Sequence, residues 1–236
     1  MRITVINGGM RHGSTWHCKE LFLQELSNYG EIETVEINLP KDMPNQCCGC
    51  FTCFLKGEAN CPHAEKMEPI LKAIKDAELI IMTSPVYGLD VSGSLKVLLD
   101  HLCFLWITHR PEPSMFHKIG LTVTTTAGAG IAHTTKTMRN SMSFWGMKKI
   151  FSIKRRVAAM KWEDITEKRK KGIQKDIRRK AGRIFKALKN EKKRRYPFNR
   201  KFLFGMMRGM MKKNTWNPHD RKHWEDQGWL GKARPF

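Results

Sequence analysis

The sequence predicts an α/β fold, in which a doubly wound sheet of five parallel strands is followed by a basic helical extension. Short runs rich in β-branched and apolar residues alternate with longer segments whose apolar positions recur at helical spacing. Such alternation is typical of a parallel sheet with helices on both faces. Five such units at this chain length fit the strand order 2-1-3-4-5. The expected strands are Arg2–Asn7, Ile32–Ile37, Leu79–Thr83, Lys118–Thr125 and Met147–Ile153.

The first and third of these strands have the clearest patterns. Arg2–Asn7 alternates and is rich in β-branched residues, whereas Leu79–Thr83 is a continuous apolar run that ends at a Ser-Pro pair. A continuous run of this kind is typical of a strand buried on both faces. The expected helices are the segment from Cys18 to Gly30, Lys66–Asp76, Ser94–Leu105 and Thr134–Trp145.

The charge is unevenly spread and separates two regions. Residues 1–150 contain 15 Lys and Arg against 14 Asp and Glu, whereas residues 151–236 contain 28 against 8. The formal charge of +21 therefore belongs almost entirely to the last third of the chain. We predict a fold domain at 1–155, with a cysteine-rich insertion at 44–62, and a basic helical extension at 156–236.

The basic extension has two interpretations. Lys161–Lys189 carries apolar residues at helical spacing among dense Lys and Arg, which predicts an amphipathic helix with a solvated charged face. The same charge would attract an acidic electron-carrier protein or an anionic membrane surface, and Phe202–Met211 suits a peripheral membrane contact or an oligomer contact. Nucleic acid is not expected, because no nucleic-acid-binding motif accompanies the charge.

The start of the chain and its cysteines predict a cytoplasmic location. Met1–Asn7 is too short for the apolar region of a signal peptide, and no apolar stretch approaches the about 20 residues that span a bilayer. The seven cysteines are odd in number, and five of them lie within Cys47–Cys61. This distribution does not suit a secreted disulfide framework.

The segment Ser84–Lys96, SPVYGLDVSGSLK, joins the third strand to the next helix. Such a connection lies at the carboxyl edge of the sheet, where open α/β sheets bind ligands. Pro85, Val86, Tyr87 and Gly88 suit a flat heteroaromatic ring, because loop amides reach the polar edge of the ring while apolar atoms cover its faces. The alternative is a structural turn in which Tyr87 only packs.

The loop Gly8–Thr15, after the first strand, predicts a phosphate site. Gly9 lets backbone amides approach an anion, and the N-terminus of the next helix favours negative charge. Arg11 adds a cation, and the hydroxyls of Ser14 and Thr15 add donors, which together suit a phosphate monoester. The loop has neither the Walker pattern nor G-x-G-x-x-G. The alternative is a plain turn in which Ser14 caps the helix.

The third loop, Thr124–Gly130, ends the fourth strand and should reach the same edge. Its small and polar residues allow close approach to a ligand. The candidate residues are Thr126, Gly128 and Gly130.

SPVYGLDVSGSLK resembles the SPVY-x-x-x-x-SG-x-LK signature of flavodoxin-like, NAD(P)H-dependent FMN reductases, a family that includes the iron–sulfur flavoproteins. The resemblance covers about residues 1–150, although Gly9 and Met10 replace Ser and Pro of the family's first loop, and Ala127 replaces a glycine. It implies a flavodoxin-like fold, non-covalently bound FMN, a nicotinamide nucleotide as co-substrate and a homo-oligomer. The FMN residues implied are Gly9, Arg11, Ser14, Thr15, Pro85, Val86, Tyr87, Gly88, Thr126, Gly128 and Gly130.

Four cysteines of the insertion have the spacing C-x2-C-x2-C-x7-C, which suits a [4Fe-4S] cluster and resembles the compact motif of iron–sulfur flavoproteins. FMN reductases without a cluster carry similarly placed cysteines, so free or redox-active thiols are an equal alternative, and zinc is a third. Cys48 is not an expected ligand, and Cys18 and Cys103 are expected to be small buried side chains. The candidate metal ligands are Cys47, Cys50, Cys53 and Cys61.

The predicted function is an FMN-dependent NAD(P)H oxidoreductase of the flavin- or quinone-reductase type. The alternative is an iron–sulfur flavoprotein that transfers electrons between ferredoxin-type carriers and FMN and does not use a nicotinamide nucleotide. A third hypothesis is a membrane- or partner-docking protein with a vestigial flavin site.

Overall fold

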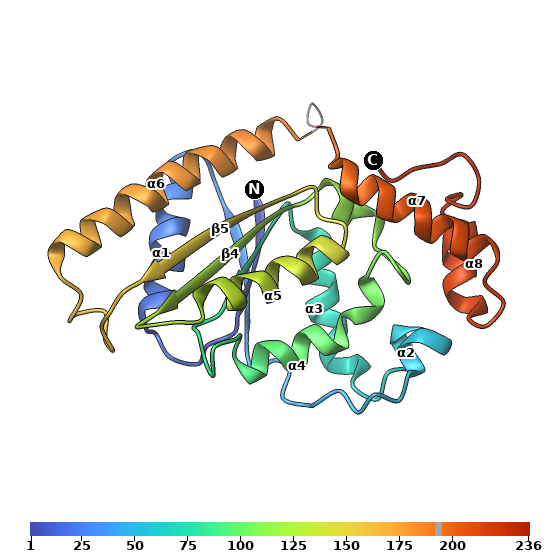
Figure 1. Cartoon of the computed structure of the whole chain (residues 1–236), viewed down its shortest axis with the longest axis horizontal. Coiled ribbons are helices and arrows are strands. Elements are labelled where there is room, and N and C mark those ends of the chain that lie inside the picture. Colours follow the sequence, from blue (N-terminus) through green and yellow to red (C-terminus); the bar gives the residue numbers. More distant parts are fainter. Residues whose placement is uncertain (192–194) are drawn as a thin grey trace.

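The computed structural model describes residues 1–191 and 195–236, and a sheet of five parallel strands lies at its centre (Figure 1). The strand order β2-β1-β3-β4-β5 confirms the order predicted from the sequence. The predicted extension includes residues 192–194, which lie outside the described residues. The strands are β1 (Arg2–Asn7), β2 (Glu33–Asn38), β3 (Leu79–Thr83), β4 (Ile119–Thr126) and β5 (Lys149–Arg156).

Helices cover both faces of this sheet (Figure 1). Alternate side chains of β3 point to opposite faces, so that Leu79 and Ile81 join one buried cluster whereas Ile80 and Met82 join the other. Burial on both sides explains the continuous apolar run of this strand. One face carries α1 (Ser14–Ser27) and α6 (Glu167–Lys189), and the other carries α3 (Ala64–Asp76), α4 (Gly93–His101) and α5 (Ile131–Phe144).

The strand register brings the loops after β1, β3 and β4 to one edge. Asn7 pairs with Thr83 across β1 and β3, and Thr83 pairs with Val123 across β3 and β4. Backbone hydrogen bonds continue beyond the strands, because the N–H of Gly8 donates to the carbonyl of Thr83 (2.9 Å) and the N–H of Val86 donates to that of Thr125 (3.2 Å). The sheet therefore positions the loops that follow it.

The predicted helices are all present, but their bounds differ from those predicted, and two of the differences have a clear structural reason. The helix predicted over Ser94–Leu105 corresponds to α4, which ends at His101. The 3-10 helix η2 (Cys103–Leu105) follows it, because this change of direction buries Phe104 and Leu105 in the core. The predicted helix from Lys161 begins at Glu167, where an acidic residue occupies the first turn of α6 and favours the start of a helix. Ile165 is buried just before this start.

The insertion between β2 and α3 has little regular structure. It contains the one-turn helix α2 (Thr52–Leu55) and the 3-10 helix η1 (Glu58–Asn60). The described part of the extension after α6 consists of α7 (Phe198–Lys212) and α8 (Pro218–Asp226), which pack with η3 (Pro113–His117) around Phe116, Phe204 and Trp224.

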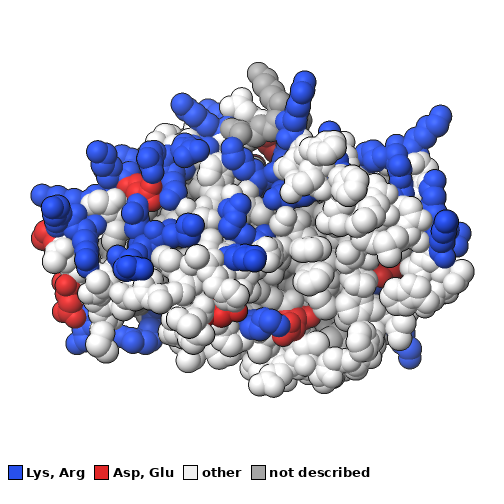
Figure 2. Space-filling view, viewed as in Figure 1, with Lys and Arg blue, Asp and Glu red and all other residues white. Residues whose placement is uncertain are grey.

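The surface reflects the uneven charge of the sequence. Lys and Arg gather densely over α6, which lies at the upper left of the view (Figure 2). Its apolar side, which includes Ile173, Ile177 and Ile184, is buried against α1 and the sheet. Among the described residues, no helix is long and apolar enough to cross a membrane.

Candidate functional site

A pocket of about 220 Å³ lies at the carboxyl edge of the sheet, and we call it the carboxyl-edge pocket. Its walls come from the loops after β1, β3 and β4, which are the three loops that the sequence places together, and from the segment after β5. Eight of the eleven predicted FMN residues line it: Gly9, Arg11, Ser14, Thr15, Pro85, Val86, Tyr87 and Thr126.

The first loop presents the N-terminus of α1 to this pocket. Gly13 is the N-cap residue of α1 and Ser14 is the first helical residue, so the alternative in which Ser14 caps the helix is wrong. The first N–H groups of a helix have no acceptor within the helix. Ser14 and Thr15 belong to the first turn of α1 and line the pocket, so the N–H groups of this turn lie beside the pocket. The buried Thr15 hydroxyl hydrogen-bonds that of Thr125 (2.7 Å), which ties this loop to β4.

The second loop contains a tight turn. Tyr87 and Asp90 exchange backbone hydrogen bonds of 2.9 and 3.0 Å, and Gly88 and Leu89 between them have φ values of 55° and 68°. Two successive positive φ values define the type I′ geometry, which explains the glycine. The hydroxyl of Thr137 on α5 donates to the Asp90 carboxylate (2.8 Å), and this hydrogen bond anchors the turn to α5. Gly88 shapes the turn and is not among the lining residues of the pocket.

The third loop supports the second. Gly130 has φ +85°, and a Cβ atom there would lie 2.7 Å from Cγ1 of Val86. Only glycine therefore lets the two loops approach this closely. The Thr126 hydroxyl donates to the Ala129 carbonyl (2.8 Å) and accepts from the N–H of Gly128 (3.2 Å), which closes the loop on itself. Neither Gly128 nor Gly130 lines the pocket.

Several residues that line the pocket were not predicted from the sequence. Asn7 ends β1, Trp16 belongs to α1, and Val157, Ala159 and Met160 follow β5. The signal was available for the last three, because the loop after a fifth parallel strand reaches the same edge as the others. No sequence pattern singled out Asn7, whose side-chain amide donates to the carboxylate of Glu36 (2.7 Å) on β2.

A second cavity, of about 300 Å³, lies at the cysteine-rich insertion, and we call it the cysteine cavity. All seven cysteines of the chain are free thiols. Cys103, expected to be a buried hydrophobic side chain, is half-buried at this cavity, whereas Cys18 is fully buried as expected. The cysteines that line the cavity are Cys47, Cys48, Cys50, Cys53, Cys61 and Cys103.

The thiols of this cavity are not chemically equivalent. Hydrogen bonds from the side chain and backbone of Thr52 lower the pKa of Cys50 below its ordinary value. Burial raises the pKa of Cys53 to about 11 and that of Cys103 to about 12. Since the thiolate is the nucleophile and the metal ligand, Cys50 is the thiol most readily ionised among these three.

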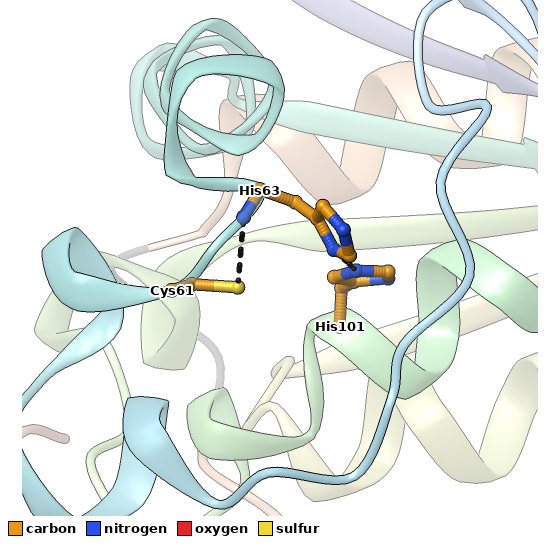
Figure 3. Close-up of side chains that lie close together, drawn as sticks. All are labelled: Cys61, His63 and His101. Carbon is orange, nitrogen blue, oxygen red and sulfur yellow. Dashed lines mark hydrogen bonds between the residues drawn. The ribbon is translucent and has the colours of Figure 1, made fainter.

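Two histidines join Cys61 in a cluster that the sequence analysis did not single out (Figure 3). Nδ1 of His63 lies 3.1 Å from Nε2 of His101, and the backbone N–H of His63 donates to Sγ of Cys61 (3.5 Å). One ligand atom from each residue lies within 4.8 Å of the others. Such a sulfur and nitrogen set suits a transition metal such as zinc. His63 is close to Cys61 in the sequence, but only the fold brings His101 from the end of α4.

The carboxyl-terminal helix α8 supports the cysteine cavity through a buried ion pair. The guanidinium of Arg110 pairs with the fully buried carboxylate of Asp220 and also donates to the carbonyls of Cys53 and Phe54. Nδ1 of His109 lies 2.8 Å from the same Asp220 carboxylate. Arg110 therefore connects the insertion to α8, which lies far from it in the sequence.

Helix α4 joins the two cavities. Its N-cap, Ser92, accepts from the N–H of Leu95 (3.3 Å) and donates to the carbonyl of Gly8, beside the carboxyl-edge pocket. Its last residue, His101, lines the cysteine cavity. At a rise of 1.5 Å per residue, the nine residues of α4 separate the two ends by about 13 Å.

The sheet order and the pocket at its carboxyl edge define a flavodoxin-like protein. The family model of the NADPH-dependent FMN reductases matches residues 1–158. The chain belongs to this family, as the resemblance of the Ser84–Lys96 segment implied.

Two curated relatives of similar sequence agree with this assignment. An iron-sulfur flavoprotein from Archaeoglobus fulgidus is 29% identical over 129 residues, which are 54% of this chain and 55% of the relative. An iron-sulfur flavoprotein from Methanocaldococcus jannaschii is 39% identical over 101 residues, which are 42% of this chain and 51% of the relative. The chain thus spans about half the length of the curated relatives it matches.

Solved structures share the fold. An FMN-dependent NADH-azoreductase from Bacillus anthracis, in complex with FMN, has a TM-score of 0.61 at 14% identity, over 78% of this chain and 99% of that chain. An NADH:FMN oxidoreductase in its apo form has a TM-score of 0.52 at 18% identity, over 75% of this chain and 86% of that chain. At sequence identities of 14% and 18%, the similarity to these structures shows a shared flavodoxin-like fold and nothing further.

Proposed function

We propose that this protein is an FMN-dependent oxidoreductase that uses NAD(P)H as its electron donor. One observation carries the proposal, namely the convergence of three loops, predicted separately from the sequence, on one pocket at the carboxyl edge of the sheet. The family of the chain supports it. Bound FMN would supply the hydride chemistry, while the protein supplies binding, orientation and electrostatics.

The donors of the pocket fit the two ends of FMN. Ser14 and Thr15 lie at the N-terminus of α1, where backbone N–H groups and the helix dipole favour a phosphate. In the loop before this helix, Gly9 allows close approach to the ligand and Arg11 adds positive charge. Pro85, Val86 and Tyr87 would border the ring, with the loop amides at its polar edge. In this proposal Gly88 and Gly130 act by holding that loop in shape, and Thr126 closes the far side of the site, whereas Gly128 lies outside the pocket.

The test combines FMN titration with turnover of NADH and NADPH. Arg11→Ala removes a charged donor to the phosphate and should weaken FMN binding by about tenfold. Met10→Ala is the matched control, because Met10 is exposed in the same loop and does not line the pocket. A wild-type protein that binds no added FMN, or equal affinities for both variants, would contradict the proposed site.

A second candidate function is electron transfer through a [4Fe-4S] cluster. The specific observation in its favour is that all four predicted ligands are free thiols on one cavity. Cys47, Cys50, Cys53 and Cys61 would hold the cluster, which would supply one-electron transfer. This donor set fits a cluster, and α4 connects the cavity to the flavin end of the molecule.

Iron, sulfide and zinc assays on protein purified without oxygen distinguish the metal alternatives. About four irons and four sulfides per chain, lost in Cys50→Ser but retained in Cys48→Ser, would support the cluster. One zinc per chain that is lost in His101→Ala would instead indicate a mononuclear site at Cys61, His63 and His101. Protein with neither metal would leave redox-active or idle thiols.

The proposal also includes partners. The basic surface over α6 suits an acidic electron-carrier protein, because opposite charge accelerates association. The homo-oligomer and the cytoplasmic location stay predictions. Sedimentation velocity of the FMN-loaded protein tests the first of these.

A further inference from the structure

Helix α7 exposes a row of large apolar side chains. Phe198, Phe202, Met206 and Met210 follow one another at intervals of four residues, and 82%, 66%, 49% and 58% of their surfaces are exposed. Residues four apart are neighbours on a helix surface, so these side chains form a continuous strip along the helix. Trp216, just beyond α7, is also exposed. We call these five residues the α7 strip.

The opposite side of α7 is already occupied. Phe204, Met207 and Met211 are buried in the cluster that contains Phe116 and Trp224. The rings of Phe204 and Trp224 stack with their centroids 4.8 Å apart. The core of the protein therefore holds α7 by one face, and the four helical residues of the α7 strip lie on a different, solvent-facing side of the helix.

Positive charge surrounds this strip. The sequence between Glu191 and Asp220 contains nine Lys and Arg and no Asp or Glu. Lys201, Lys212 and Lys213 are exposed on and beside α7. The first two are eleven residues apart, which places them in one row along the helix. In Figure 2 the largely uncharged surface over α7 is bordered by Lys and Arg.

We propose that the α7 strip docks the protein on an anionic lipid bilayer, with α7 lying in the plane of the interface. Aromatic and methionine side chains beside lysines are the composition of interfacial helices, whose apolar face enters the headgroup region while cations meet anionic lipid. The charge argues against a second copy of the chain, because two such faces would bring like charges together. The inference is independent of the flavin proposal.

Flotation with vesicles of phosphatidylcholine alone, or with 3:1 phosphatidylcholine:phosphatidylglycerol, provides the test. We expect the full-length protein to float with the anionic vesicles and not with the neutral ones, and added salt should weaken the binding. Phe198→Ser/Phe202→Ser should reduce the vesicle affinity by about tenfold or more, since each substitution removes a large apolar surface from the interface. Both side chains are exposed, so the fold and FMN affinity should not change.

Two control variants separate docking from general attraction. Lys171→Glu/Lys175→Glu, on the exposed face of α6, has the same change of charge as Lys212→Glu/Lys213→Glu but lies away from the strip. The α7 variant should lose most of its binding, whereas the α6 variant should retain most of it. Val35→Ser, at a half-exposed position of β2, controls for loss of an apolar side chain elsewhere.

Other outcomes would overturn the proposal. Equal binding by the wild type and Phe198→Ser/Phe202→Ser would mean that charge alone attracts the protein to vesicles. A concentration-dependent dimer that this double variant abolishes, together with no vesicle binding, would make the strip a contact between copies. A blue shift of tryptophan emission on vesicle addition that disappears in Trp216→Phe would support insertion of the strip, and its absence would contradict it.

Discussion

The carboxyl-edge pocket and the cysteine cavity lie at opposite ends of α4, but different parts of the chain hold them in place. Strand ends and the loops directly after them build most of the pocket. An irregular insertion builds most of the cavity, and α8 supports it through Asp220 and Arg110. The first site therefore follows from sheet register, whereas the second depends on contacts between segments distant in the sequence.

Breaking the Arg110–Asp220 pair should produce the largest difference between the two sites. Asp220→Asn removes the fully buried carboxylate that pairs with Arg110 and leaves this guanidinium only the partly exposed carboxylate of Glu58 (3.1 Å) as a charged partner. Loss of one member of a buried ion pair typically costs about 3–5 kcal/mol of stability, and the remaining pair with Glu58 places the expected loss at the lower end of this range. We expect a lower urea midpoint and faster hydrogen exchange in residues 47–61, with FMN affinity retained by the folded protein.

The control for that experiment is Asp226→Asn. Asp226 pairs with Lys222 on the exposed surface of the same helix (2.9 Å), and its loss should leave the urea midpoint unchanged. Equal effects of the two substitutions, or unchanged hydrogen exchange in the insertion, would mean that α8 does not support the cysteine cavity.

A change at Gly130 should affect the other site. Ala at this position would be strained at φ +85°, and its Cβ would press on Val86, so the Pro85–Gly88 loop must move. The expected cost is about 1–2 kcal/mol of stability, with weaker FMN binding in a fluorescence titration and no change in metal content. Gly128→Ala is the matched control, because a Cβ there meets no atom within 4 Å. Similar affinities for the two variants would contradict the supporting role of Gly130.

The smallest expected effect is a pH dependence at the α8 end of the molecule. Burial lowers the pKa of His223 below 6.5, although its hydrogen bond to the Pro111 carbonyl (3.1 Å) partly opposes this shift. The unfolded chain then binds the proton first as the pH falls, so this group should reduce stability below about pH 6.5, until the folded form is also protonated. The slope from one proton cannot exceed about 1.4 kcal/mol per pH unit.

Urea unfolding of the wild type and His223→Gln between pH 7.5 and 5.5 measures this contribution. The variant should lose less stability than the wild type over that range, because glutamine keeps an amide donor but does not titrate. Parallel pH profiles would show that His223 does not contribute to acid sensitivity.

The parts of the fold that were predictable are those that depend on local pattern. The bounds of β1 and β3 agree with the predicted Arg2–Asn7 and Leu79–Thr83, because alternation and a doubly buried apolar run are properties of a few adjacent residues. Errors occurred where packing overrides periodicity, as at η2, where burial of Phe104 and Leu105 ends the helix predicted to continue.

The α/β class, the strand order and the three loops that meet at the carboxyl-edge pocket follow from the amino-acid sequence alone, because parallel strands connected by helices bring their carboxyl ends to one edge. Only the tertiary structure placed His101 beside His63, 38 residues away, and Arg110 beside Asp220, 110 residues away. It also decided which side of α7 is buried and which is exposed. The physical reason is that side-chain contacts across such separations depend on how helices pack, whereas strand order and loop position depend on chain connectivity and the period of each segment.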